Sequence, residues 1–190
     1  VRVKAATRFE KQVENDLKDV ALDKPRFEVR MDDDGEFSPN GTDRVEFYFS
    51  ANPGELPRQL AKVASGGEAS RLMLMLKTAS HSNDAGKTAV FDEVDVGIGG
   101  RVAEAVGRKL KALAATQQVF CVTHQPQIAS LADRHFLVEK SVEKGKTRIG
   151  VRELNATEKV DEIARMLAGE QITDAARENA RSMLASAGAN

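Results

Sequence analysis

The chain has 190 residues, a length that favours one domain with at most a small appendage. Its formal net charge of −1 gives no overall positive field, so any contact with DNA would be local or would belong to another part of a larger protein. A single cysteine, Cys121, excludes an internal disulfide framework and is typical of a reducing compartment. The sequence has no run of about 18 apolar residues and no apolar signal core, so we expect neither a membrane span nor a signal peptide.

The first elements in chain order are predicted to be a helix and an antiparallel hairpin. Residues 1–22 place apolar side chains three and four positions apart, which predicts a helix that starts without a cap, as if cut from a longer one. Residues 26–31 and 44–50 alternate apolar and polar side chains, which predicts two strands with one buried face each. The acidic link at 32–43 lacks the spacing of a calcium loop, so we interpret it as a solvated, turn-rich connection.

The rest of the chain predicts strands that alternate with helices. After a break at 52–57, we expect a short helix at 58–63 and a longer helix that opens with Ser65. The later elements are expected in this order: a strand at 88–93, a helix at 101–115, a strand at 118–124, a short helix from Pro126, a hairpin at 135–154, and helices at 157–168 and 174–187, which Gly169 and Thr173 separate. Such alternation is typical of a parallel sheet covered by helices on both sides. Cys121 would be a buried, unreactive thiol in this sheet, and the last two helices would pack on the same lobe.

Gly86-Lys87-Thr88 resembles the end of a phosphate-binding loop, but the rest of that motif is missing. The full motif requires another glycine five residues before Gly86, where His81 stands, and it must open a helix. The segment after Thr88 is an apolar strand instead. No other stretch has the full motif, so this chain is expected to lack a phosphate loop.

Two carboxylates, Asp92 and Glu93, follow the apolar run at 88–91. Ligands of open α/β sheets bind at the carboxyl ends of the strands, which is where this pair would emerge. The first carboxylate could reach Mg²⁺ through a water, and the second could polarise an attacking water. An acidic turn at a strand end is the plainer interpretation, and this motif alone does not decide between them.

Two further features favour the chemical interpretation. Ser65 and Glu68 fit a capping box, and the glycines between them, Gly66 and Gly67, would expose backbone N–H groups at a helix start that can grip a phosphate. His124 ends the strand at 118–124 and is either a structural histidine or a side chain that reaches a terminal phosphate. Both strand ends should open onto the same edge of the sheet.

The order of these motifs resembles that of the ABC-type ATPase superfamily and, within it, the SMC-like proteins, from about Val63 to the C-terminus. The resemblance implies a signature loop, a Walker B strand, a D-loop and a switch histidine. In that order, these correspond to Ser65, Gly66, Gly67 and Glu68; Asp92 and Glu93; Asp95; and His124.

The resemblance also implies a fold and partners. The fold class would be α/β, the C-terminal lobe of an ABC/SMC-type ATPase head at 23–190, with a mostly parallel sheet flanked by helices, antiparallel hairpins, and a coiled-coil stub at 1–22. The Walker A loop would lie in a separate N-terminal lobe, and two heads would sandwich two ATP molecules with Mg²⁺. Asp92 would help to hold the metal, Glu93 would activate water and His124 would sense the γ-phosphate.

The remaining implied contacts lie between two heads. Ser65 and Gly67 would meet the nucleotide on the opposite head, with Asp95 near the seam of the dimer. The complete protein would hydrolyse ATP in DNA double-strand-break repair and recombination, in the bacterial cytoplasm near the nucleoid, and this chain alone would be inactive. Two alternatives stay open: a non-enzymatic module for dimerisation or DNA binding, and a transporter-type ATPase, which the helical stub and the lack of a membrane segment disfavour.

Overall fold

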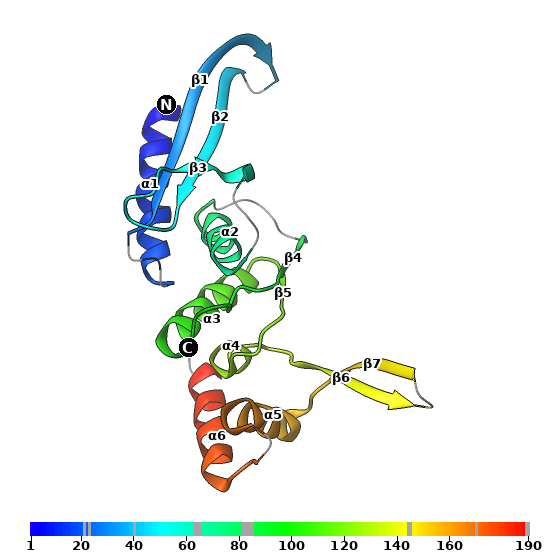
Figure 1. Ribbon diagram of the computed structural model, residues 1–190. Helices are drawn as coiled ribbons and strands as arrows, with labels where there is room; N and C mark the ends of the chain where they lie inside the picture. The colour runs from blue at the N-terminus through cyan, green and yellow to red at the C-terminus, as the bar shows by residue number, and fades with distance from the viewer. Residues whose placement is uncertain are drawn as a thin grey trace. The chain divides into compact units, whose positions relative to one another are not determined.

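The computed structural model describes residues 1–20, 22, 24–39, 41–62, 66–80, 86–143, 146–169 and 171–188. These residues form two compact units, Val1–Val122 and Thr123–Asn190 (Figure 1). The observed elements are mixed helix and sheet, with antiparallel hairpins and a parallel pair of strands, as the predicted fold class requires. In the described part of the chain, no helix is both long enough and apolar enough to cross a bilayer.

The first unit begins with helix α1 (Arg2–Lys18), which lies along a hairpin of β1 (Arg26–Ser38) and β2 (Gly41–Ser50) (Figure 1). Two carboxylates one helical turn apart fix this arrangement. Glu14 accepts a hydrogen bond from the Phe27 N–H at 3.0 Å, and Glu10 accepts one from the Val29 N–H at 2.7 Å. The predicted first helix is therefore confirmed over most of its length, and its glutamates satisfy donors on the edge of β1. Its interpretation as a coiled-coil stub stays a prediction.

The predicted hairpin is confirmed, with Arg26 opposite Ser50 and a regular register as far as Asp33 and Asp43. The strands reach further into the link than predicted, and Ser38 still pairs with Gly41. The side chains described at the far end of this hairpin are exposed on both faces. The strands there therefore show no alternation of apolar and polar residues from which they could be predicted.

The short helix predicted at 58–63 is wrong over its described part. Arg58–Gln59 form strand β3, which pairs with Tyr48 and Phe49 of β2, and Leu60–Lys62 form a single 3₁₀ turn, η1. The Gln59 amide also donates to the Glu46 carboxylate at 2.8 Å. Residues 58–59 are extended because they pair with β2. The local sequence pattern, which predicted a helix, does not contain this long-range pairing. Val63 lies outside the described residues.

The remaining part of the first unit contains α2 (Gly67–Ala79), β4 (Thr88–Phe91), α3 (Gly100–Ala114) and β5 (Gln118–Cys121). Strands β4 and β5 are parallel and in register, from Thr88 opposite Gln118 to Phe91 opposite Cys121. These predicted elements are confirmed, with boundaries that shift by a few residues. Helix α2 begins one residue later than its predicted cap requires, because the N-cap residue is Gly66.

The expectation that helices cover both faces of this sheet is wrong for the chain by itself. Phe91 is 6% exposed, whereas Val90, its neighbour on the opposite face, is 67% exposed. Phe120 and Val122 lie on the same face as Val90 and are 45% and 61% exposed. We call Val90, Phe120 and Val122 the open face. An apolar face of this kind in a parallel sheet is normally covered by another layer.

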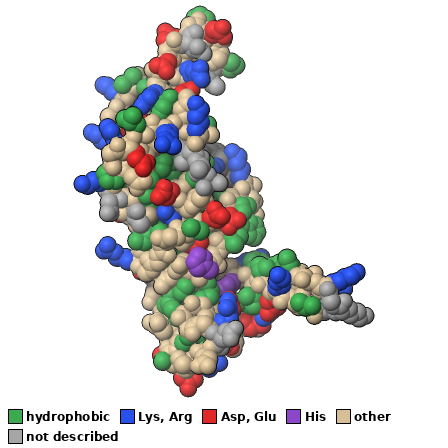
Figure 2. Space-filling view, viewed as in Figure 1, with side chains coloured by type: hydrophobic (Ala, Val, Ile, Leu, Met, Phe, Trp, Pro, Cys, Tyr) green, Lys and Arg blue, Asp and Glu red, His purple; other side chains and the backbone are tan. Residues whose placement is uncertain are grey.

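The second unit contains α4 (Pro126–Ala129), a hairpin of β6 (Phe136–Glu143) and β7 (Lys146–Glu153), α5 (Ala156–Ala168) and α6 (Asp174–Gly188). The hairpin is exposed along its length, and Figure 2 shows hydrophobic side chains interleaved with basic ones on it.

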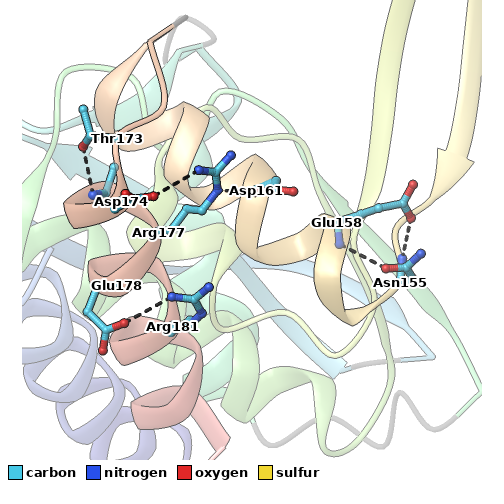
Figure 3. Close-up of polar contacts among 9 residues, drawn as sticks. Asn155, Glu158, Asp161, Thr173, Asp174, Arg177, Glu178 and Arg181 are labelled. Carbon is cyan, nitrogen blue, oxygen red and sulfur yellow. Dashed lines mark hydrogen bonds and ion pairs between the residues drawn. The ribbon is translucent and has the colours of Figure 1, made fainter.

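Helices α5 and α6 form a separate small core with α4. Ile163, Ala164 and Ala180 are fully buried there, next to Ala129. Asn155 caps α5 through a capping box with Glu158 (Figure 3). Gly169, at φ 78°, ends α5 as predicted, and the Thr173 hydroxyl accepts the Ala176 N–H at 3.1 Å, as the predicted cap requires (Figure 3). Arg177 joins the two helices through a 2.9 Å ion pair with Asp161. The helices thus pack on each other and on α4 within the second unit, and their expected packing on the lobe that contains the sheet stays a prediction.

Candidate nucleotide site

The two predicted carboxylates, Asp92 and Glu93, lie directly after β4 and are exposed. Glu93 has a φ of 59° and is the single non-glycine residue with positive φ in the described part of the chain. This left-handed conformation costs about 1–3 kcal/mol and is concentrated at functional sites, where the surrounding structure holds it in place. The backbone therefore supports a special role for Glu93 that composition alone could not show.

Asp92 supplies a single carboxylate to this edge. Its Oδ1 accepts a hydrogen bond from the Glu93 N–H at 2.9 Å, and its Oδ2 has no partner among the described residues. The described residues hold no group of three or more potential metal ligands. Mg²⁺ at nucleotide sites is usually bound by one or two carboxylates together with phosphate oxygens, so the donor set of Asp92 fits such an ion.

The glycine pair before α2 has two different structural reasons. Gly66 has a φ of 149°, a conformation that residues with a side chain rarely adopt, and a Cβ there would meet nothing within 4 Å. A Cβ on Gly67 would lie 2.8 Å from the Val96 carbonyl oxygen, 2.8 Å from Arg71 Nη1 and 3.1 Å from the Glu93 carbonyl oxygen. Glycine is thus required at position 67 because the protein's own loop approaches it closely. The sequence had suggested that a bound ligand was the reason. Ser65 lies outside the described residues.

Helix α2 holds the loop of residues 92–96, which we call the acidic loop. The Ser70 hydroxyl donates to the Asp92 carbonyl at 2.8 Å. Arg71 Nη1 donates to the carbonyl oxygens of Val96 at 2.9 Å and Val94 at 3.3 Å. Sequence reasoning missed Ser70 and Arg71; the available signal was an arginine directly before the apolar run at 72–76.

Asp95 of the acidic loop and Cys121, at the end of β5, interact electrostatically. Asp95 is 2% exposed in this chain. Burial, together with the smaller effect of the negative charges of Asp95 and Asp92, raises the pKa of the Cys121 thiol to about 12. Cys121 is half-buried, so the predicted full burial is not observed. Its low reactivity stays a prediction that the raised pKa supports, since a thiolate is the reactive form.

The carboxyl ends of β4 and β5 lie at one edge of the sheet, as predicted. The Val122 N–H donates to the Phe91 carbonyl at 2.9 Å, which extends the parallel ladder past both strands. His124 follows two residues later, at the start of the second unit, with its Nε2 3.3 Å from the Gln125 side-chain nitrogen. Its predicted contact with a phosphate stays a prediction.

A groove of about 540 Å³ runs between α2 and β4 and ends at this edge. Ser70 and Met73 line it on the helix side, and Val90 lines it on the strand side. Gly66, Asp92 and Glu93 also lie on its wall, together with Ala69 and Lys77 of α2. Three of the predicted site residues, Gly66, Asp92 and Glu93, thus share one groove with Val90 of the open face.

No family model matches the chain. Two solved structures share its fold. The Smc head domain of Pyrococcus yayanosii, with a coiled coil and joint, has a TM-score of 0.53 at 15% identity and aligns with 90% of this chain and 30% of that chain. The Smc head domain of Pyrococcus furiosus, with an extended coiled coil and bound to the C-terminal domain of ScpA, has a TM-score of 0.52 at 17% identity, over 86% and 39%. The chain therefore has the fold of an SMC head domain.

Curated proteins give a more specific relationship. The DNA repair protein RecN of Halalkalibacterium halodurans is 42% identical over 188 residues, which cover 97% of this chain and 33% of that protein. RecN of Rickettsia bellii is 42% identical over 183 residues (96% and 33%), and RecN of Streptomyces coelicolor is 41% identical over 201 residues (100% and 35%). The chain is related to RecN over nearly all of its residues, and it spans about a third of the length of the curated relatives it matches.

Proposed function

We propose that this chain is the C-terminal half of an ATP-hydrolysing, SMC-like head that acts in bacterial DNA double-strand-break repair and recombination. One observation carries the proposal. The strained Glu93, its neighbour Asp92 and the glycine start of α2 meet in one groove, in a chain about 40% identical to RecN proteins. The RecN relatives favour this function over a transporter-type ATPase. The place of action would be the bacterial cytoplasm, near the nucleoid.

Each predicted site residue has a task in this head. Asp92 helps to hold Mg²⁺, which neutralises phosphate charge when it is bound with ATP. Glu93 accepts a proton from the attacking water, and its exposed carboxylate at the strand end suits that task. His124 senses the γ-phosphate. Phosphoryl transfer depends mainly on positioning and charge stabilisation, so the fixed backbone of the acidic loop supports catalysis directly.

The open face of β4 and β5 supports the proposal of a second lobe. Val90, Phe120 and Val122 would be exposed to water in the working protein if nothing covered them. An N-terminal lobe that carries the Walker A loop would cover this apolar face and bring the missing phosphate cradle to the ends of the same strands. Hydrolysis would therefore require both lobes.

A second head completes the site across the dimer. Ser65, Gly66, Gly67 and Glu68 of one head would face the nucleotide bound on the other head, where the start of α2 presents backbone N–H groups. Asp95 of the acidic loop would lie near the seam of the dimer. A nucleotide shared between two heads links hydrolysis to dimerisation.

The substitution Glu93→Gln in the full-length gene product tests this function. Loss of the general base should lower the rate of ATP hydrolysis by roughly 10²–10⁴-fold, while ATP binding persists. The matched control is Glu104→Gln, an exposed carboxylate on α3 whose contact is an i,i+4 ion pair with Arg108. We expect the control to hydrolyse ATP like the wild type. Near-normal hydrolysis by Glu93→Gln would refute the assigned role, and hydrolysis by the 190-residue chain alone would show a phosphate site that the motifs do not reveal.

A further inference from the structure

Arg71 is a charged residue in an unusual environment. It lies on α2 directly before the apolar run at 72–76 and is 5% exposed. Burial lowers the pKa of its guanidinium, and the charge of Glu68, one turn earlier, partly opposes this effect. Its Nε atom has no hydrogen-bond partner. A buried charge with incomplete hydrogen bonding is destabilising compared with an apolar side chain of similar volume, so stability alone does not account for an arginine here.

The contacts of Arg71 join two parts of the candidate site. On one side, its Nη1 fills the space where a Cβ of Gly67 would stand. On the other side, the same nitrogen donates to the carbonyl oxygens of Val94 and Val96. Ser70, the preceding residue, holds the Asp92 carbonyl. Two consecutive residues of α2 therefore hold the whole acidic loop against the start of the helix.

This contact explains how Glu93 keeps its strained backbone. A left-handed conformation persists when neighbouring contacts over-determine it. The Glu93 carbonyl accepts the Val96 N–H at 3.2 Å, and Arg71 holds the Val96 carbonyl on the other side of the same residue. If the guanidinium is removed, the loop loses the hydrogen bonds to the carbonyls of Val94 and Val96, and Glu93 is no longer held.

We propose that Arg71 is a positioning residue that makes the start of α2 and the acidic loop move as one body. A nucleotide that contacts Gly66 and Gly67 from the opposite head then sets the position of Glu93 in the same head. Arg71 touches neither nucleotide. We call the contacts of Arg71 with the acidic loop the clamp. The consequence of the clamp for catalysis rests on the proposed function, but the clamp itself can be tested without nucleotide.

The first experiment measures amide hydrogen exchange in the full-length gene product without ATP. It compares Arg71→Met, Arg71→Lys and the matched control Arg108→Met, which removes an exposed arginine whose side chain is 60% accessible on α3. We expect exchange of the peptide covering 92–98 to rise at least tenfold in Arg71→Met, to rise less in Arg71→Lys, and to stay at the wild-type level in Arg108→Met. Peptides from α5 and α6 should not change. Unchanged exchange at 92–98 in Arg71→Met would overturn the clamp.

The second experiment measures steady-state ATP hydrolysis and the stoichiometry of nucleotide binding. For Arg71→Met we expect a loss of roughly 10- to 100-fold in kcat, because a misplaced catalytic group costs this much, with KM and the binding stoichiometry within twofold of the wild type. Arg71→Lys, which keeps a cationic donor, should recover part of the loss. A merely structural arginine would lower kcat and stoichiometry together in both variants, and that result would overturn the proposal, as would a kcat within twofold of the wild type in Arg71→Met.

The two proposals fail in different ways. If the proposed function is wrong, the wild-type protein and Arg108→Met hydrolyse no ATP, whatever the state of the loop. If the clamp is wrong, the wild type hydrolyses ATP and loses activity in Glu93→Gln, while Arg71→Met behaves like the wild type in both experiments.

Discussion

Gly67 offers the sharpest test of the packing at the candidate site, because its neighbour Gly66 serves as a matched control. An alanine Cβ at Gly67 would lie 2.8 Å from the Val96 carbonyl oxygen and 3.1 Å from the Glu93 carbonyl oxygen. Both are backbone atoms, so the acidic loop must shift to make room. The Arg71 guanidinium, also at 2.8 Å, is the end of a flexible side chain and can move more easily.

The expected free energy follows from two opposing effects. Overpacking costs typically about 1–3 kcal/mol, whereas alanine in place of glycine in a helix recovers about 0.5–1 kcal/mol. Gly67→Ala should therefore lower the free energy of unfolding by roughly 0–2.5 kcal/mol, a modest change. The larger effect is local, since displacement of the Glu93 carbonyl weakens its hydrogen bond from the Val96 N–H.

Gly66→Ala changes the backbone without this collision. A Cβ there meets nothing within 4 Å, but the φ of 149° disfavours any residue with a side chain. We expect Gly66→Ala to be destabilising with little change at the acidic loop. Chemical denaturation and hydrogen exchange of the peptide covering 92–98 in the full-length gene product separate the two effects. Equal exchange in both variants, at the wild-type level, would refute the close approach at Gly67.

Two further predictions concern other parts of the chain. Asn155→Ala removes the cap of α5, where the Asn155 side chain accepts hydrogen bonds from the N–H groups of Thr157 and Glu158 at 3.0 Å. Thermal denaturation should show that the free energy of unfolding falls by about 1 kcal/mol. The control Glu178→Ala, which removes an exposed ion pair with Arg181, should lower it by less than about 0.5 kcal/mol. A loss that is equal in both variants would contradict the capping box. Since the pKa of Cys121 is raised from 9.0 to about 12, the native thiol should have about a thousandfold smaller thiolate fraction at pH 8 than an unfolded one, and alkylation should be correspondingly slow until denaturant is added. The unfolded chain releases this proton first as the pH rises, so Cys121 should lower the stability between about pH 9 and 12. Fast alkylation of the native protein at pH 8 would contradict the raised pKa of the thiol.

The sequence predicted the elements whose signal is local. The apolar run at 88–91 followed by Asp92 and Glu93 correctly placed the carboxylates at a strand end, and Gly169 correctly marked the end of α5. The strand at Arg58–Gln59 was missed because its conformation comes from pairing with β2, which no local pattern records.

The candidate site itself was predicted only in part. The positions of Asp92 and Glu93 follow from the strand pattern, but the left-handed backbone of Glu93 depends on contacts with α2, more than twenty residues earlier in the chain. For the same reason Gly67 was assigned to a ligand, although its neighbour is the protein's own carbonyl group. The spacing of motifs in a sequence indicates which segments lie close together. It does not indicate whether a glycine makes room for a ligand or for the protein's own backbone.

The two faces of the β4–β5 sheet suggest how the work of the proposed site is divided. On the covered face, α3 packs against β5 and Phe91 is buried, while α2 holds the acidic loop from the strand ends. The residues proposed for water activation and metal binding are therefore placed by contacts within this chain. On the open face, Val90, Phe120 and Val122 stay exposed. Contacts within this chain already position the carboxylates at the strand ends. A lobe that packs on the open face would therefore supply the phosphate-binding loop without reorganising the acidic loop.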